Sequence, residues 1–385
     1  MSKEYTALGL MSGTSMDGVD ASIIQSDGES KYKVIKDKYF EYPQAIYKRL
    51  TKLRGKIKRS KDLKKFSKEI KNVEKEITLF HAKAVNEILK KTKANIDFIG
   101  FHGQTIYHNA KERISKQLGD GKLLSKLTKK TVIYNFRKND LKNYGDGAPL
   151  SPIFHKLIVK QNKIRLPAII LNIGGIANVT TIDKEQNMLC LDIGPGNCLI
   201  DEWIRGNSKK KYDKNGKIAK SGKKSVKILK KIIEEFEKLQ VSREADGIKT
   251  FDTKDFDISH LKGLSLKDGA ATLTHLTGNI IGRDVAGYLA DKFNEDKKLA
   301  QWIVLVCGGG RKNKTLISSI ENSIGKQNML IDRFESIDVF NVNGDFVESQ
   351  AFAYLAIRSY LKLPISFPET TGVKRPCTGG VLVKN

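Results

Sequence analysis

The sequence predicts an α/β protein built from two domains of similar layout with a cleft between them. The chain opens with an apolar strand, a glycine-rich turn and a second strand between residues 6 and 25. The same layout returns between residues 167 and 181. Long helical patterns follow each of these strand pairs. Because the two halves repeat an architecture without repeating a sequence, they indicate a duplicated domain.

The first half contains one long helical pattern and several further strands. Apolar residues recur every three or four positions from Leu63 to Phe80, which gives a single apolar stripe along a helix. Alternating side chains over residues 32–39 predict a strand. Residues 95–101 and 131–136 predict two short buried strands, and a polar cluster around His102 follows the first of them.

The second half has its own strands and helices. Residues 188–193 form an apolar strand that runs into a Gly-Pro-Gly turn, and residues 302–307 form another that ends in three glycines. Helical patterns cover residues 226–239, 270–293 and 347–361.

We expect the first domain to span residues 1–150 and the second to span residues 151–345. The prolines near residue 150 mark the boundary. The last helical pattern is expected to cross back, so that residues 346–385 pack on the first domain.

Composition favours a chain that works in a reducing compartment. The 385 residues suit two domains, and 39% of them are hydrophobic. We find no apolar run of about 18 residues and no secretory leader pattern, so we expect a cytoplasmic protein without membrane association. The four cysteines are widely spaced and form no Cys-x-x-Cys pair, which disfavours a disulfide framework or a zinc site.

The formal net charge of +26 admits two interpretations. A basic chain can bind nucleic acid, but here the lysines are interleaved with acidic residues along helical faces. Lysine also outweighs the arginine that base recognition favours. We therefore expect a solvated basic surface and no specific nucleic-acid partner. Such a surface can still attract anionic small molecules.

The first glycine turn has the composition of a phosphate-binding site. Successive N–H groups in a tight turn around Gly13 and Gly18 form an anion-binding nest, and glycine lets a ligand approach the backbone. Thr14 and Ser15 add hydroxyl donors, and Asp17 is a candidate ligand for magnesium. The alternative is an ordinary hairpin turn, since Asp-Gly favours turns in any case.

Two later glycine segments repeat this chemistry. Gly174 and Gly175 form a turn between the strands of the second pair, and residues 308–310 are three glycines after a buried strand. Each could equally be a structural turn. Their combination with the first turn in a duplicated layout favours nucleotide binding.

Asp192 is the candidate catalytic base. It lies at the end of an apolar strand, beside the Gly-Pro-Gly turn, where a doubly wound sheet places its ligands. A carboxylate there can accept a proton during phosphoryl transfer. The alternative is an Asp that caps the following helix. No P-loop, complete Gly-x-Gly-x-x-Gly or His-Glu-x-x-His pattern is present to suggest another chemistry.

These motifs together resemble the superfamily of sugar kinases, actin and heat-shock chaperones, and within it the anhydro-N-acetylmuramic acid kinases. The resemblance covers essentially the whole chain. The matching segments are Leu10–Asp20, Phe101–Thr105, Gly147–Leu150 with Pro152 and His155, Leu171–Asn178, Asp192–Asn197, Asp268–Thr274, Cys307–Gly310, and Glu348 before Ala351–Ala353.

The resemblance implies two actin-like (ribonuclease H-like) domains with ATP and substrate in the cleft between them. It implies phosphorylation of 1,6-anhydro-N-acetylmuramic acid by ATP, with magnesium, while water opens the anhydro ring. The product, N-acetylmuramate 6-phosphate, would serve peptidoglycan recycling. A homodimer is expected on the same ground. The alternatives are a kinase for another sugar and a non-catalytic ATP-binding scaffold.

Family roles transfer to matching positions of this chain. Asp192 would activate water, and the sugar would contact His102, Gln104 and Glu348. ATP would be bound by Gly13, Thr14, Ser15, Met16, Asp17, Gly18, Val19, Asp20, Gly174, Gly175, Gly308, Gly309 and Gly310.

Overall fold

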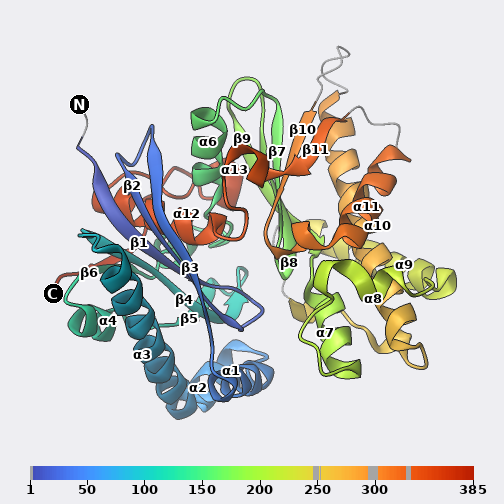
Figure 1. The fold of residues 1–385 in the computed structure, drawn as a ribbon, viewed down its shortest axis with the longest axis horizontal. Helices are drawn as coiled ribbons and strands as arrows, with labels where there is room; N and C mark the ends of the chain where they lie inside the picture. Colours follow the sequence, from blue (N-terminus) through green and yellow to red (C-terminus); the bar gives the residue numbers. More distant parts are fainter. Residues whose placement is uncertain (1–2, 246–250, 252, 294–301, 327–330) are drawn as a thin grey trace. The chain divides into compact units, whose positions relative to one another are not determined.

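The computed structural model describes residues 3–245, 251, 253–293, 302–326 and 331–385. The chain divides into two compact units (Figure 1). Unit 1 consists of Met1–Lys163 and Phe346–Asn385, and unit 2 consists of Ile164–Asp345.

Unit 1 is built on a seven-stranded mixed sheet. Its strands are β1 (Tyr5–Ser12), β2 (Gly18–Ser26), β3 (Tyr32–Glu41), β4 (Phe98–Asn109), β5 (Ile114–Leu118), β6 (Thr131–Tyr134) and β12 (Val381–Val383). Its helices are α1 (Gln44–Lys56), α2 (Ser60–Lys65), α3 (Ser67–Thr92), α4 (Gly121–Thr128), α5 (Arg137–Lys142), α6 (Pro152–Gln161), α12 (Val347–Tyr360) and α13 (Pro368–Thr371).

Unit 2 is built on a five-stranded mixed sheet. Its strands are β7 (Ala168–Ile173), β8 (Ile176–Ile182), β9 (Met188–Pro195), β10 (Trp302–Cys307) and β11 (Ile331–Ser336). Its helices are α7 (Cys198–Asn207), α8 (Lys217–Lys220), α9 (Val226–Ala245), α10 (Leu266–Phe293) and α11 (Lys314–Gly325).

The two sheets share one topology. Unit 1 contains the strand order β3-β2-β1-β4-β6, and unit 2 has the order β9-β8-β7-β10-β11. In each unit the first strand pairs antiparallel with the second and parallel with the fourth. The duplicated α/β layout predicted from the two glycine-turned strand pairs is therefore confirmed.

Helix α6 lies with unit 1, so the units divide after Lys163, whereas the sequence suggested a boundary near residue 150. Aromatic packing explains this position. The ring of Phe154 lies 4.9 Å from that of Tyr32 and 5.5 Å from that of Tyr354. The side chain of Gln161 also accepts from the Tyr32 N–H at 2.7 Å and donates to its carbonyl at 3.0 Å.

Helix α12 packs unusually close to the sheet of unit 1. Gly9 of β1 and Gly100 of β4 are neighbours in register. A Cβ atom at Gly9 would lie 1.9 Å from the carbonyl oxygen of Ser349, and one at Gly100 would lie 2.2 Å from that of Phe352. Leu8 and Leu10 point to the opposite face, where they join the core that α3 covers. Two adjacent glycines therefore fix the height of α12 above the sheet.

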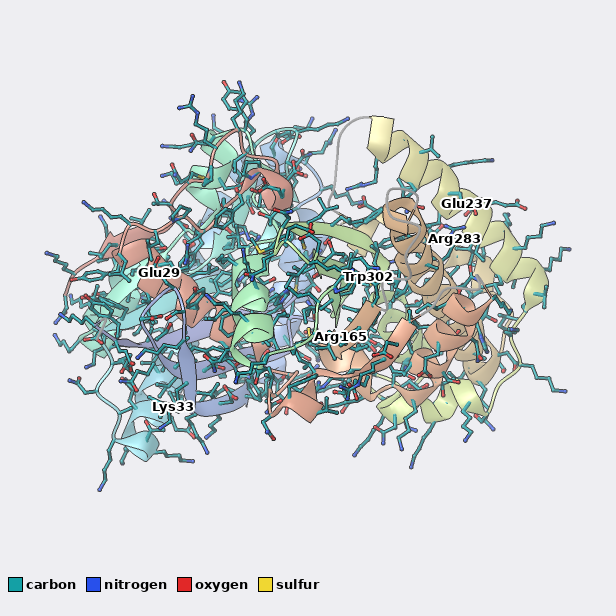
Figure 2. The ribbon with its side chains drawn as sticks, turned by 90° about the horizontal axis from the view of Figure 1, so that it is seen from above. Glu29, Lys33, Arg165, Glu237, Arg283 and Trp302 are labelled. Carbon is teal, nitrogen blue, oxygen red and sulfur yellow. The ribbon has the colours of Figure 1, made fainter. Side chains whose placement is uncertain are left out.

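Charged side chains surround each unit (Figure 2). The ion pair between Glu237 of α9 and Arg283 of α10, both labelled in the figure, is one of several on the surface. The absence of a specific nucleic-acid partner stays a prediction. Among the helices that the structure describes, none is long and apolar enough to span a membrane.

We predict that Gly9→Ala destabilises the protein. The added methyl group must push α12 away from β1, and overpacking of this kind costs about 1–3 kcal/mol. The matched control is Gly55→Ala, because Gly55 lies in α1 and a Cβ there meets nothing within 4 Å. That change should stabilise by up to about 1 kcal/mol. Urea denaturation of both variants measures the difference, and equal stabilities would contradict the close packing.

Candidate functional site

The residues singled out from the sequence fall into two groups, one in each unit. The segment 13–20, His102, Gln104 and Glu348 belong to unit 1. Asp192 and the later glycines belong to unit 2. The predicted cleft between the domains stays a prediction, and each group is built up separately below.

The first glycine turn connects β1 to β2 and is held from β4. The N–H of Met16 donates to the carbonyl of Gly13 at 3.2 Å, which closes the turn, and Met16 itself has a φ of 58°. The Gln104 amide also donates to the Gly13 carbonyl, at 2.9 Å. Gln104 thus positions the turn. Its other amide atom, Oε1, is buried without a protein partner in the described residues.

A buried polar chain supports the base of this turn. Nδ1 of His81 lies 2.8 Å from the Ile77 carbonyl and must donate to it, so Nε2 is the acceptor. The Ser12 hydroxyl, 3.1 Å away, donates to that Nε2 and accepts from the Tyr42 hydroxyl at 2.9 Å. Burial lowers the pKa of His81 to about 4. Because Ser12 and His81 are 1% and 0% exposed, this Ser–His pair is structural and not a nucleophile.

His102 occupies a bulge in β4. Leu10 pairs with Phe101 and Met11 pairs with Gly103, which leaves His102 as the extra residue. Gly103 has a φ of 76°, and a Cβ there would lie 2.3 Å from the Leu118 carbonyl oxygen. The bulge therefore depends on glycine and redirects the histidine side chain.

The imidazole of His102 is neutral and fixed in one tautomer. Nδ1 donates to the Gly103 carbonyl at 2.7 Å, and Nε2 accepts from Nη2 of Arg137 at 2.9 Å. Burial, together with the positive charge of Arg137, holds the pKa of His102 well below its ordinary value.

Arg137 is a site candidate that the sequence analysis missed. It begins α5 and also donates to the Gly147 carbonyl at 2.7 Å. Burial raises the pKa of Glu348, in the first turn of α12, while the charge of Arg137 opposes that rise. The signal was topological, because β4 and β6 are parallel neighbours paired up to Phe101 and Tyr134, and the residues that follow these two positions reach the same edge. His102, Arg137 and Glu348 form the polar cluster of unit 1.

In unit 2 the turn at Gly174–Gly175 and the Gly-Pro-Gly turn at residues 194–196 are joined by backbone hydrogen bonds. The Gly174–Gly175 turn accepts from the N–H of Gly196 at 2.9 Å and from that of Asn197 at 2.8 Å. A Cβ at Gly196 would lie 2.3 Å from the Gly174 carbonyl oxygen, so this contact requires glycine.

The third glycine segment lies against the same strand end. β10 runs parallel to β7, and Cys307 pairs with Asn172. Gly308 has a φ of 78°, and a Cβ there would lie 2.5 Å from Oδ1 of Asn172. A Cβ at Gly310 would lie 2.2 Å from the Ile173 side chain. The turns of unit 2 therefore gather at the carboxyl end of β7.

Asp192 lies beside these turns at a second bulge. Ala177 pairs with Gly194 and Asn178 pairs with Asp192, so the intervening Ile193 is the extra residue of β9. The Asp192 carboxylate accepts the N–H of Phe251 at 2.8 Å. Because Asp192 lies within β9 and α7 begins only at Cys198, the alternative role as a helix cap is wrong.

Two glycines mark space for a ligand. A Cβ at Gly13 would meet only Oγ of Ser15 at 3.8 Å, and one at Gly309 would meet nothing within 4 Å. Neither residue has a φ in the left-handed region. The fold does not need glycine at these positions, whereas a bound phosphate or nucleotide would benefit from the exposed backbone.

A protein-only metal centre is absent from the described part of the chain, where no cluster of three His, Cys, Asp or Glu side chains could hold an ion. Asp17 is exposed and accepts a hydrogen bond from the Ser15 hydroxyl at 2.7 Å. A single carboxylate of this kind suits magnesium, which takes most of its ligands from phosphates and water.

The chain matches known proteins along its length. The family model for anhydro-N-acetylmuramic acid kinase matches residues 5–385. An anhydro-N-acetylmuramic acid kinase of Pelagibacter ubique (strain HTCC1062) is 54% identical over 387 aligned positions, covering 100% of both chains. Another, from Agrobacterium fabrum (strain C58), is 37% identical and also covers 100% of both. These findings confirm the resemblance inferred from the motifs. The chain belongs to the anhydro-N-acetylmuramic acid kinase family, and it is therefore a sugar kinase.

Proposed function

We propose that this chain phosphorylates the O6 oxygen of 1,6-anhydro-N-acetylmuramic acid with ATP while water opens the anhydro ring. The products are N-acetylmuramate 6-phosphate and ADP. The observation that carries the proposal is the position of Asp192, a carboxylate at a strand bulge beside the glycine turns of unit 2. Family membership supports the choice of sugar.

Asp192 acts as the general base. It takes one proton from a water molecule, and the water oxygen bonds to the anomeric carbon. The bond from that carbon to O6 breaks, and its electron pair stays on O6. O6 then attacks the γ-phosphorus, and the bond from phosphorus to ADP breaks. The proton on Asp192 leaves to solvent.

The backbone orients Asp192. Its carboxylate accepts the N–H of Phe251 at 2.8 Å, which fixes the direction of the group. Orientation matters because a base must lie within hydrogen-bond reach of the proton that it takes.

The nucleotide is held by backbone amides. The Gly13–Asp20 segment binds phosphates, and the glycine turns of unit 2 accommodate the rest of ATP. Magnesium would neutralise charge on the phosphates, and Asp17 would hold it directly or through water.

The sugar is bound by the polar cluster of unit 1. The neutral His102, held by Arg137, presents no titrating charge near neutral pH, since its pKa is held well below its ordinary value. Glu348 provides acceptors for hydroxyl or amide hydrogens of the sugar. Gln104 fixes the glycine turn that binds the phosphates, because its amide donates to the Gly13 carbonyl. The enzyme would act in the cytoplasm as a homodimer, in peptidoglycan recycling.

Labelled water tests the overall reaction. With 1,6-anhydro-N-acetylmuramic acid and ATP in ¹⁸O water, mass analysis should find one ¹⁸O in the sugar phosphate for each ADP released. Unlabelled N-acetylmuramate 6-phosphate incubated in the same water controls for exchange at the anomeric hydroxyl. A phosphorylated product that gains no label beyond this control would contradict the proposed ring opening.

We predict that Gly13→Val weakens ATP binding by about tenfold or more, because the side chain occupies space needed by a phosphate. The fold should tolerate the change, since the nearest atom to an added Cβ is 3.8 Å away. Gly55→Val is the matched control at an equally open position of the same unit. ATP affinity, measured by calorimetry, should fall only in the first variant. An unchanged ATP affinity in folded Gly13→Val would show that residues 13–20 do not bind the nucleotide.

We predict that Asp192→Asn abolishes most turnover while ATP still binds. General-base contributions are about 10²–10⁴-fold, and here the base also creates the nucleophile, so the loss should reach the upper end of that range. Asn keeps the size of the side chain and can still accept the Phe251 N–H.

Glu185→Gln is the control for this variant. Glu185 is exposed in the turn at the other end of the β8–β9 hairpin, so the change removes the same charge without touching the site. Its turnover should equal that of the wild type. Near-normal turnover of folded Asp192→Asn would exclude Asp192 and direct the search for the base to Glu348.

A further inference from the structure

Asp140 is a buried carboxylate outside the groups assigned to the substrates. It lies in α5, three residues after Arg137, and is 0% exposed. Oδ1 accepts the N–H of Gly147 at 2.6 Å. Oδ2 is buried without a hydrogen-bond partner among the described residues. A buried carboxylate with an unpartnered oxygen costs free energy that an apolar side chain would not, so its presence here needs a reason other than stability.

The turn at residues 145–147 is shaped around this carboxylate. A Cβ at Gly145 would lie 2.3 Å from Oδ1 of Asp140, so a side chain there would displace the oxygen. The Gly145 N–H also donates to the backbone carbonyl of Asp140 at 3.0 Å. Gly147 has a φ of 74°, and a Cβ there would lie 2.9 Å from the Leu141 side chain. The turn therefore fits against α5 only with glycine at both positions.

Asp140 and Arg137 hold the same residue from one side of α5. A spacing of three places their side chains next to one another on the helix. Asp140 accepts the N–H of Gly147, and Arg137 donates to the carbonyl of Gly147 at 2.7 Å. The guanidinium also donates through Nη2 to Nε2 of His102 at 2.9 Å. Gly147 is thus the fixed point against which Arg137 is oriented within the polar cluster of unit 1.

We propose that Asp140 is a positioning residue for the sugar and acts through Gly147 and Arg137. The inference rests on the proposed function, which assigns the sugar to the polar cluster of unit 1. While the carboxylate holds the N–H of Gly147, the carbonyl of the same residue stays in place for Arg137, and the guanidinium keeps its direction toward His102. Without the carboxylate the turn shifts, and the cluster no longer presents one arrangement to the sugar.

Steady-state kinetics of ADP release by the full-length protein test this role. In Asp140→Ala the KM for 1,6-anhydro-N-acetylmuramic acid should rise about tenfold or more, because a hydrogen bond to a charged group is strong enough for a change of that size. The KM for ATP should change by less than about twofold, since the phosphate turn is held by Gln104 and not by this group. Asp140→Asn should restore the wild-type KM for the sugar, because its amide oxygen can accept the Gly147 N–H.

Asp62→Ala is the matched control. Asp62 is a buried carboxylate of unit 1 that accepts the N–H groups of Lys58 and Arg59 at 3.0 and 2.9 Å. Its removal breaks the same kind of bond outside the polar cluster, so it should lower the melting temperature and leave the KM for the sugar unchanged. A merely structural role of Asp140 would give this same pattern in Asp140→Ala.

The outcomes separate the inference from the function on which it rests. A wild type that does not phosphorylate the anhydro sugar would overturn both. An active wild type with an unchanged sugar KM in Asp140→Ala, or with an equal rise in Asp140→Asn, would overturn positioning through Gly147 and leave the proposed reaction intact. Should Asp140→Ala not fold, Asp140→Ser decides in its place, because its hydroxyl is too short to reach the N–H. Failure of both to fold beside a folded Asp140→Asn would assign the carboxylate to the fold and overturn the positioning role.

Discussion

The close approach of backbone to backbone at glycine is the constraint on which both candidate sites depend. In unit 1, Gly9 and Gly100 let α12 lie almost on the sheet, which places the helix that carries Glu348. In unit 2, glycines at 308 and 310 let the segment after β10 lie against the end of β7. A side chain at any of these four positions would collide with backbone or with a buried side chain, so the polar groups could not keep their places. The glycines that define the motifs therefore include many that the packing requires, and only some, such as Gly13 and Gly309, that have open space around them.

The two candidate polar residues share a second device. His102 and Asp192 both lie at bulges, where an extra residue shifts the register of one strand against its neighbour. A regular strand would alternate these side chains strictly between the two faces of the sheet. The bulge breaks that alternation near the strand end, and a glycine with positive φ follows each of them, Gly103 at 76° and Gly194 at 138°. The two bulges lie on strands that are not equivalent in the duplicated topology, β4 in unit 1 and β9 in unit 2. His102 is itself the extra residue of the first bulge, whereas Asp192 directly precedes the extra residue Ile193 of the second.

Much of the fold could be predicted because its signals are local. An apolar strand, a glycine turn and a second strand are contiguous in the chain, so residues 6–25 and 167–181 revealed the duplication directly. Features that depend on distant partners could not be read in this way. Helix α6 belongs to unit 1 because Phe154 packs on Tyr32 and Tyr354. Arg137 became a site candidate only once β4 and β6 proved to be parallel neighbours. The motifs alone also left two roles open for Asp192, a catalytic base or a helix cap. The bounds of β9 and α7 exclude the helix cap, because Asp192 lies within the strand and well before the helix begins.

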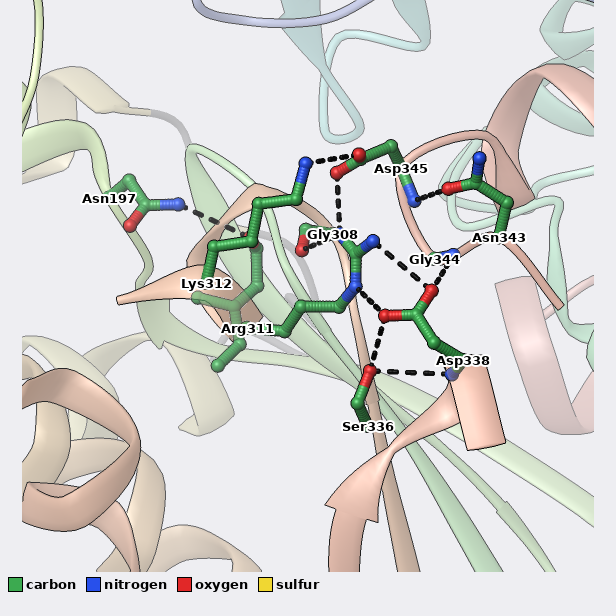
Figure 3. A network of polar contacts seen from close by, with 10 residues as sticks. Asn197, Gly308, Arg311, Lys312, Ser336, Asp338, Asn343, Gly344 and Asp345 are labelled. Carbon is green, nitrogen blue, oxygen red and sulfur yellow. Dashed lines mark hydrogen bonds and ion pairs between the residues drawn. The ribbon is translucent and has the colours of Figure 1, made fainter. Parts of the chain in front are cut away.

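The buried guanidinium of Arg311 needs a reason other than stability. Its side chain is 6% exposed, whereas those of Asp338 and Asp345 are 45% and 30% exposed. Removing a guanidinium from water costs several kcal/mol, and its attraction to carboxylates often does no more than offset that cost. An apolar residue could fill the same space without the penalty. An arginine fork, however, fixes direction as well as distance, because its donors lie in one plane. At this position it bonds to a strand end, a glycine turn and the last residue before the chain leaves the unit (Figure 3). One buried guanidinium therefore ties the glycine turn after β10 to the last residue of unit 2 and fixes the direction of both.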